Sequence, residues 1–189
     1  MTYHDLLAAA QQNPAGADFH TLRMAYARSE AYAPYSHDVK AVEALREALP
    51  AADFDAALAA IARLLEASYL DIEAHIAADY VYTRLNQPDR SAYHRGFAQG
   101  LLGAIYHTGD GRAFDTAFIV LAIPEEYTVL RMMGLRPGGQ ALVEHEGHWF
   151  DVIDATHAQT GVPAKVHFNI DIPHAWLQHH GPGHDHGAA

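Results

Sequence analysis

Apolar residues recur every three or four positions through the first half of the chain, the spacing that places them on one face of an α-helix. The clearest example runs over residues 53–68 and is rich in alanine, which has the highest helix propensity. Its apolar positions are Phe54, Leu58, Ile61, Leu64 and Leu65. The pattern predicts an amphipathic helix in this segment.

Two helices are predicted upstream of it. The first begins after Asp18, whose carboxylate can accept a hydrogen bond from a backbone N–H of the first turn. A turn around Pro34 separates it from the second helix, which should end at Pro50. The predicted buried stripe of this second helix comprises Val39, Val42, Leu45 and Leu49.

Two longer helices are predicted over residues 71–85 and 89–106. Pro88 and Asp89 lie between them, where they would end one helix and start the next, so the pair should form an antiparallel hairpin. Hairpins of this length resemble tetratricopeptide units, although the chain has no clear 34-residue internal repeat. Because such units cannot bury their apolar faces alone, we expect the second half of the chain to cover them.

The later helix of this hairpin carries Gly96, Gly100 and Gly103 on one face. Each glycine destabilises a helix by up to about 1 kcal/mol relative to alanine, so the stripe should have a packing role. A groove that admits a ligand or a partner segment is the alternative. The expected packing partners on the preceding helix are Ala74, Ala77 and Ala78.

The second half of the chain has the shorter periods of β-structure. Residues 118–123 form a continuous apolar run that predicts a buried strand, and a short helix over 124–133 should follow it. Further strands are predicted over 140–145, 148–154 and 165–172, with a final helical turn over 173–178. The fold class is therefore α+β, with N-terminal antiparallel helical hairpins packed on a small, mainly antiparallel C-terminal sheet. We expect one compact domain over 1–178, with a helical half (1–108) and a sheet half (109–178), and a disordered His-rich tail over 179–189.

Strand register decides which polar residues of the sheet share a face. A two-residue turn at Glu146 and Gly147 pairs Val143 with Phe150. For the next hairpin we expect Asp151 to pair with Asn169, because a slip of one residue would swap the faces. Phe150, Val152, Phe168 and Ile170 would then face the core together. The opposite face would carry Glu144, Trp149, Asp151, His167, Asn169 and Asp171.

Carboxylates and an imidazole on one surface can hold a divalent metal ion, or can pair an acid with a base. The sequence indicates no other cofactor. The alternative is a solvated sheet face, which is what antiparallel sheets commonly present. The apolar ring of Trp149 on the same face is evidence against a face that contacts only solvent. The candidate metal ligands are Glu144, Asp151, His167, Asn169 and Asp171.

His75, Asp79 and His94 are candidate ligand- or partner-contacting residues, together with Trp149. Counted from the centre of the hairpin turn, His75 and His94 should lie on the order of 9 Å out of level, too far apart to share one ion. Asp79 is nearer the level of His94 and also follows His75 by one helical turn, so we expect a His–Asp hydrogen bond within the helix pair. A buried pair of this kind can also act as a general base.

Composition excludes several classes of function. The net charge is −11 and the 12 Lys and Arg residues form no basic stripe, so no nucleic-acid partner is expected. No apolar run reaches the roughly 18 residues of a membrane span. The absence of cysteine excludes disulfides and thiolate chemistry. Because the N-terminus has no basic region before Asp5, we expect no signal peptide and a cytoplasmic location, the periplasm being the alternative if a leader has been removed.

Histidine is the unusual feature of the composition, with 15 residues in the chain. The C-terminal tail can chelate Ni²⁺, Cu²⁺ or Zn²⁺ through neutral imidazoles, although an incidental linker is the alternative. The tail histidines concerned are His179, His180, His184 and His186.

Two stretches of the chain resemble a bacterial family of domains of unknown function. The first runs from Asp-Ile-Glu-Ala-His at 71–75 through Tyr-His-Arg-Gly at 93–96 to Gly-Asp-Gly at 109–111. The second runs from Glu-Glu-Tyr-Thr-Val-Leu-Arg at 125–131 through Gly-Gly-Gln at 138–140 to Phe-Asn-Ile-Asp-Ile-Pro at 168–173. The resemblance implies a tetratricopeptide-like helical front and a small α+β C-terminal part, and it implies no activity.

These observations favour a binding or interaction protein whose helical hairpins offer a surface to a protein or peptide partner. No complete catalytic constellation is evident: His145 and His148 flank a turn three residues apart, whereas a zinc-protease motif needs four-residue spacing on a helix. The sequence leaves open whether any reaction is catalysed. The alternative hypothesis is a metal-binding protein or metal-dependent hydrolase that uses the polar face of the C-terminal sheet.

Overall fold

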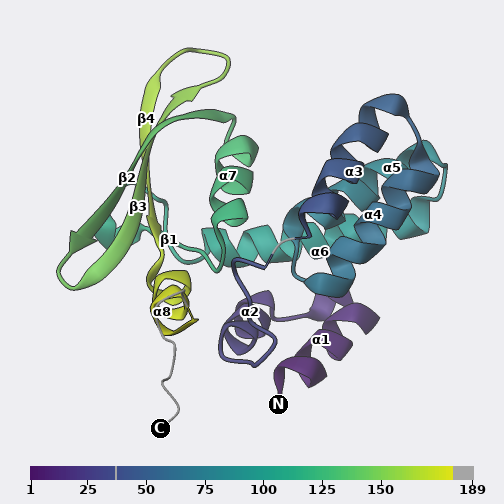
Figure 1. Ribbon diagram of the computed structural model, residues 1–189, viewed down its shortest axis with the longest axis horizontal. Coiled ribbons are helices and arrows are strands. Elements are labelled where there is room, and N and C mark those ends of the chain that lie inside the picture. The colour runs from purple at the N-terminus through teal and green to yellow at the C-terminus, as the bar shows by residue number, and fades with distance from the viewer. Residues whose placement is uncertain (37, 181–189) are drawn as a thin grey trace, which may run out of the picture. The chain divides into compact units, whose positions relative to one another are not determined.

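The computed structural model describes residues 1–36 and 38–180 of the chain (Figure 1). It confirms the α+β class, with helices followed by a sheet of mainly antiparallel strands. The chain divides into two compact units, Met1–Ala104 and Ile105–Ala189, which are described separately below. No helix among the described residues has both the length and the apolar character needed to cross a bilayer.

The first unit is helical. It contains α1 (Tyr3–Gln12), η1 (Pro14–Gly16), α2 (Phe19–Ala27), α3 (Val39–Ala51), α4 (Phe54–Ala67), α5 (Ile72–Arg84) and most of α6 (Pro88–Tyr106). Helix α1 was not predicted from the sequence, although Thr2 and Asp5 form a capping box at its start, in which each side chain accepts a hydrogen bond from the other residue's backbone N–H, at 3.2 and 2.9 Å. A hydroxyl residue followed three positions later by an acidic residue is a pattern typical of a helix start, and it predicts this helix.

Aspartate side chains set the starts of four helices in this unit. Each accepts a hydrogen bond of 3.0 Å from the backbone N–H three residues later, one of the donors that a helix leaves unpaired. The four caps are Asp18, Asp38, Asp53 and Asp71. The predicted starts after Asp18, Asp53 and Asp71 are confirmed for this reason.

Small residues line the core between α3, α4 and α5. On α3 the buried side chains are Ala41, Leu45 and Ala48, whereas Val39 and Val42 are 62% and 48% exposed. The predicted stripe of α3 is therefore wrong at both valines. Alanines allow closer approach of the helix axes, so α3 turns its alanine face rather than its valines toward α4.

The glycine stripe of α6 also packs differently from the prediction. A Cβ atom at Gly100 would collide with the ring of Phe19 on α2, and the nearest neighbour of a Cβ at Gly96 would be Pro14 in η1. Gly100 thus admits an aromatic ring against the helix backbone, and the expected contact with the α5 alanines is wrong.

The second unit contains the sheet. Its elements are η2 (Phe114–Thr116), β1 (Phe118–Ile119), α7 (Ile123–Met132), β2 (Leu135–His145), β3 (His148–His157), β4 (Pro163–Asn169) and α8 (Asp171–His180). The strand order is β1-β4-β3-β2, in which only β1 pairs in parallel among these strands. The predicted strand over 118–123 is shorter than expected because Ile123 starts α7, and the predicted strand over 165–172 gives way to α8 at Asp171.

The predicted register is right for one hairpin and wrong for the next. Val143 pairs with Phe150 as expected across the turn at Glu146 and Gly147. Between β3 and β4, however, Asp151 pairs with Phe168 rather than with Asn169. This slip of one residue puts Phe150 and Phe168 on opposite faces of the sheet.

The β3–β4 register was predicted wrongly because both faces of the sheet are covered. On one face, Tyr127 of α7 donates a hydrogen bond of 3.1 Å to Gln140 of β2. On the other, Phe114 and Ala117 pack on a small core with Phe150. The predicted register assumed a single apolar face, whereas this sheet has apolar residues on both.

Candidate ligand-binding site

The two histidines of the α5–α6 hairpin contact each other directly. Nδ1 of His75 lies 3.0 Å from Nδ1 of His94, so the prediction that the two side chains are too far apart to meet is wrong. The predicted offset along the helix axes was counted from the centre of the hairpin turn. Measured from the helix ends at Arg84 and Pro88, the two positions differ by about three residues, or roughly 4.5 Å along the axes, which two imidazole rings can bridge.

The hydrogen bonds of His75 fix the tautomers of both rings. Its Nε2 lies 2.9 Å from the carbonyl oxygen of Tyr69, and a carbonyl only accepts, so Nε2 carries the proton. In a neutral ring Nδ1 of His75 is then an acceptor, and the donor to it is Nδ1–H of His94. The lone pair of His94 is therefore on Nε2.

Burial keeps both imidazoles neutral. His75 is 0% exposed, and desolvation lowers its pKa to about 4 against the hydrogen bond to Tyr69 and with the help of the neighbouring His94. Burial also lowers the pKa of the half-buried His94, while the charge of Asp79 opposes this shift and that of Arg90 adds to it. Near neutral pH the pair therefore carries no charge.

Aromatic rings continue the histidine pair toward both the core and the surface. Phe97 stacks on His75 with ring centroids 4.5 Å apart, and Tyr82 stacks on His94 at 5.5 Å. The guanidinium of Arg90 lies over the Tyr82 ring at 5.4 Å. We call this series Phe97–His75–His94–Tyr82–Arg90 the aromatic ladder. It runs from a buried phenylalanine to an exposed arginine.

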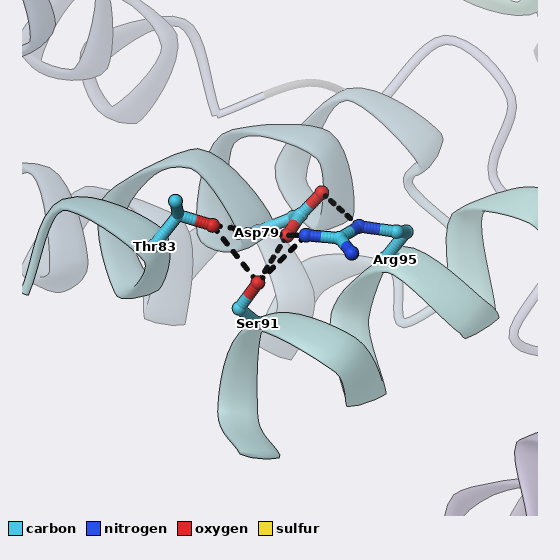
Figure 2. A network of polar contacts seen from close by, with 4 residues as sticks. All are labelled: Asp79, Thr83, Ser91 and Arg95. Atoms are coloured by element: carbon cyan, nitrogen blue, oxygen red, sulfur yellow. Dashed lines mark hydrogen bonds and ion pairs between the residues drawn. The ribbon is translucent and has the colours of Figure 1, made fainter. Parts of the chain in front are cut away.

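Asp79 belongs to a separate polar network on the same hairpin (Figure 2). Its carboxylate accepts hydrogen bonds of 2.6 Å from Ser91 and of 2.9 and 3.0 Å from Arg95. Partial burial raises the pKa of Asp79, but the hydrogen bonds from Arg95 and Ser91 outweigh it, and the net shift is downward. The expected His–Asp hydrogen bond is wrong: His75 bonds Tyr69 and His94, and Asp79 bonds Ser91 and Arg95 instead.

The residues predicted as metal ligands on the sheet do not converge. Asp151 lies on the face that α7 covers, while His167 and Asn169 lie on the other face, where His167 donates a 3.2 Å hydrogen bond to the carbonyl of Gly111. Glu144 pairs with Trp149 near the exposed end of the β2–β3 hairpin. The one-residue slip separates the candidates because it swaps the faces of β4 relative to β3.

Asp171 leaves the sheet altogether and begins α8. It accepts a hydrogen bond of 2.7 Å from the backbone N–H of Trp149 and is 2.7 Å from Nδ1 of His148. Partial burial raises the pKa of Asp171, but the hydrogen bonds from Trp149, His148 and Asn169 outweigh this effect, so the net shift of the pKa is downward. These contacts tie α8 to β3, and the Trp149 ring stacks on His174 at 4.4 Å.

Two acids of the second unit, Glu126 and Asp151, are buried, and this pair was not predicted from the sequence. Glu126 of α7 is 0% exposed, and its carboxyl group lies close to that of Asp151 on β3. Burial, followed by the negative charge of Asp151, raises its pKa to about 9. Glu126 is therefore protonated near neutral pH. Its position in an acidic first turn beside Glu125 gave no sign of burial.

The tail histidines are only partly within the described residues. His179 and His180 lie in the last turn of α8, where the His180 ring stacks on Trp176 at 4.5 Å. His184 and His186 lie outside the described residues. Within residues 1–36 and 38–180, no group of three or more histidines and acids has a geometry that could hold a metal ion.

A family model described as a domain of unknown function, DUF4919, matches residues 1–176. The chain belongs to this family. The match spans both compact units, so the DUF4919 region includes the aromatic ladder and the buried acid pair. It agrees with the resemblance to a domain of unknown function that the sequence showed. No curated protein and no solved structure matches the chain.

Proposed function

We propose that this DUF4919 protein is a binding protein that contacts its ligand through the helical unit, at Nε2 of His94. The observation that carries the proposal is the 3.0 Å contact between Nδ1 of His75 and Nδ1 of His94. Placing a neutral histidine at a fully buried position lowers its pKa and so opposes stability under mild acid. Besides its own hydrogen bonds, what His75 provides is a fixed orientation and tautomer for His94.

Fixed histidines of this kind are common where an imidazole contacts a ligand, because a partner on one ring nitrogen determines the state of the other. His94 is only partly buried, and its Nε2 has no hydrogen bond to any described residue. Nε2 therefore keeps a lone pair that no described residue uses, on a partly exposed ring that contacts the rings of Tyr82 and Tyr93.

The matched variant for testing this proposal is His94→Asn. The asparagine amide can replace Nδ1–H as donor to His75, but it has no atom in the place of Nε2. Thermal unfolding of the full chain is measured with and without the small-molecule fraction of a cell extract. We expect the fraction to raise the midpoint of the wild-type protein by about 2 °C or more and to leave that of the variant unchanged.

Circular dichroism establishes that the variant is folded, and the exposed His20→Gln variant controls for loss of one histidine. A wild-type midpoint that does not move, or equal shifts in wild type and His94→Asn, would rule out a small-molecule site at His94.

A protein partner on α3 is a second candidate function. It is favoured by the exposure of Val39 and Val42, which form an apolar strip opposite the buried Ala41 and Leu45. This is the surface that a helical-repeat-like interaction protein would use. Metal use by the sheet is not proposed, since Asp151 and His167 lie on opposite faces.

A further inference from the structure

We infer that the ligand at His94 is a phosphate group, free or as a monoester. One of its O–H groups donates a hydrogen bond to Nε2, and its negative charge pairs with the guanidinium of Arg90. This inference rests on the proposed function and names the chemistry of the same site. It follows from three features around His94: the fixed tautomer of its ring, the position of Arg90, and the pairing of the nearby Asp79 carboxylate with Arg95 and Ser91.

The tautomer decides which hydrogen-bonding role is open. Because Nδ1–H of His94 is used by His75, the other ring nitrogen, Nε2, accepts a hydrogen bond when the ring is neutral. A ligand that binds the neutral site must therefore present an O–H or N–H. Carboxylates and sulfate have no such hydrogen near neutral pH, whereas phosphate has a second pKa of about 6 and is partly protonated there.

Arg90 supplies the positive charge. It lies one turn before His94 on α6, and its guanidinium covers the Tyr82 ring that stacks on His94. Its charge acts on the His94 ring. Guanidinium groups bind phosphate oxygens through pairs of N–H donors, which fits an anion placed between the two side chains.

The remaining groups around His94 are compatible with an anion. On α5 they are His75, which is neutral, Asp79, which is paired with Arg95 and Ser91, and the Tyr82 ring. On α6, Tyr93 shares its hydroxyl with that of Tyr69 at 2.8 Å. The net charge of −11 disfavours non-specific anion binding, so phosphate bound by this chain would have to be held by a local site.

Phosphate and sulfate are a matched pair of probes because they share shape but differ in the proton. In the experiment, the full-length wild-type protein is titrated with each anion at neutral pH and constant ionic strength. Binding is measured by calorimetry and by nitrogen-15 NMR of the histidine rings. We expect phosphate to bind at least about tenfold more tightly than sulfate, and to shift the Nε2 resonance of His94. Glycerol phosphate in a parallel titration distinguishes a monoester site from one for inorganic phosphate.

Two variants assign the binding to the proposed atoms. His94→Asn should weaken phosphate binding about tenfold or more, and Arg90→Gln should weaken it about threefold or more. Equal affinity for sulfate, no phosphate binding at millimolar concentration, or phosphate binding unchanged in His94→Asn would each overturn the inference. The wild-type comparison of the two anions decides the question even if a variant fails to fold.

His75 is a positioning residue in this scheme, and it has its own readout. His75→Asn keeps an acceptor for Nδ1–H of His94, whereas His75→Leu removes it. Nitrogen-15 shifts should show a single His94 tautomer in the first variant and a mixture in the second. If the cell extract stabilises the wild type while phosphate does not bind, the phosphate inference fails and the proposed binding function stands.

Discussion

His75 is an uncharged histidine in the interior of the helical unit, and its environment makes a prediction about acid. The unfolded chain takes up a proton near pH 6.5, whereas the folded chain resists protonation down to about 4. Between these values the unfolded state binds more protons, so stability falls as the pH is lowered through this window.

We expect the wild-type protein to lose about 1–2 kcal/mol more unfolding free energy than His75→Leu when the pH is lowered from 7 to 5. Urea denaturation at the two pH values measures this difference, with the exposed His20→Gln as the control. A variant that loses as much stability as the wild type would contradict the burial of a neutral imidazole.

Glu126 makes the opposite prediction at alkaline pH. The unfolded chain releases this proton near 4.5, whereas the folded chain holds it to about 9. Stability due to this group is therefore complete below 4.5 and is lost as the pH rises toward 9, at up to about 1.4 kcal/mol per pH unit.

Glu126→Gln, which keeps the shape of the protonated acid, should remove this slope and stabilise the protein at pH 8. Thermal melts over pH 6–9 provide the measurement, and the exposed Glu144→Gln is the matched control. Parallel pH profiles for wild type and Glu126→Gln would show that Glu126 is not held protonated.

At the scale of elements, the helix starts depend on single aspartate caps. Asp53 accepts a 3.0 Å hydrogen bond from the backbone N–H of Ala56 at the start of α4. Asp53→Ala should destabilise the protein by about 1 kcal/mol, whereas Asp53→Ser, which can still cap, should cost only a few tenths. Urea unfolding midpoints compare the two; equal losses would mean that the cap contributes little.

The two faces of α3 should respond differently to substitution. Because Val39 and Val42 are exposed, replacing both with serine should change the unfolding free energy by less than about 1 kcal/mol. Leu45 is buried among the helices, so Leu45→Ala should cost about 2–4 kcal/mol. Denaturant titration distinguishes the cases, and a large loss on replacing the valines would show that they are covered and unsuited to bind a partner.

At the scale of the whole molecule, the two units depend to different degrees on long-range contacts. In the helical unit, periodicity and capping residues indicated most helices correctly, but not the contact of His75 with His94. In the sheet unit, the alternation in β4 was read as one buried face, whereas Val166 and Phe168 lie on one face and His167 contacts Phe114 on the other. Alternation cannot reveal that a loop and a helix cover opposite faces of one sheet.

The sequence by itself determined what short-range interactions control: helix starts at aspartates 18, 53 and 71, the α+β order of elements, and the β2–β3 register that a two-residue turn imposes. Only the tertiary structure decided which face of α3 is buried, how β3 pairs with β4, and that Glu126 is buried near Asp151. It also brought His75 to His94. Capping and turn geometry act within a few residues, whereas the level of two helices and the register of strands joined by a longer loop depend on how whole surfaces pack.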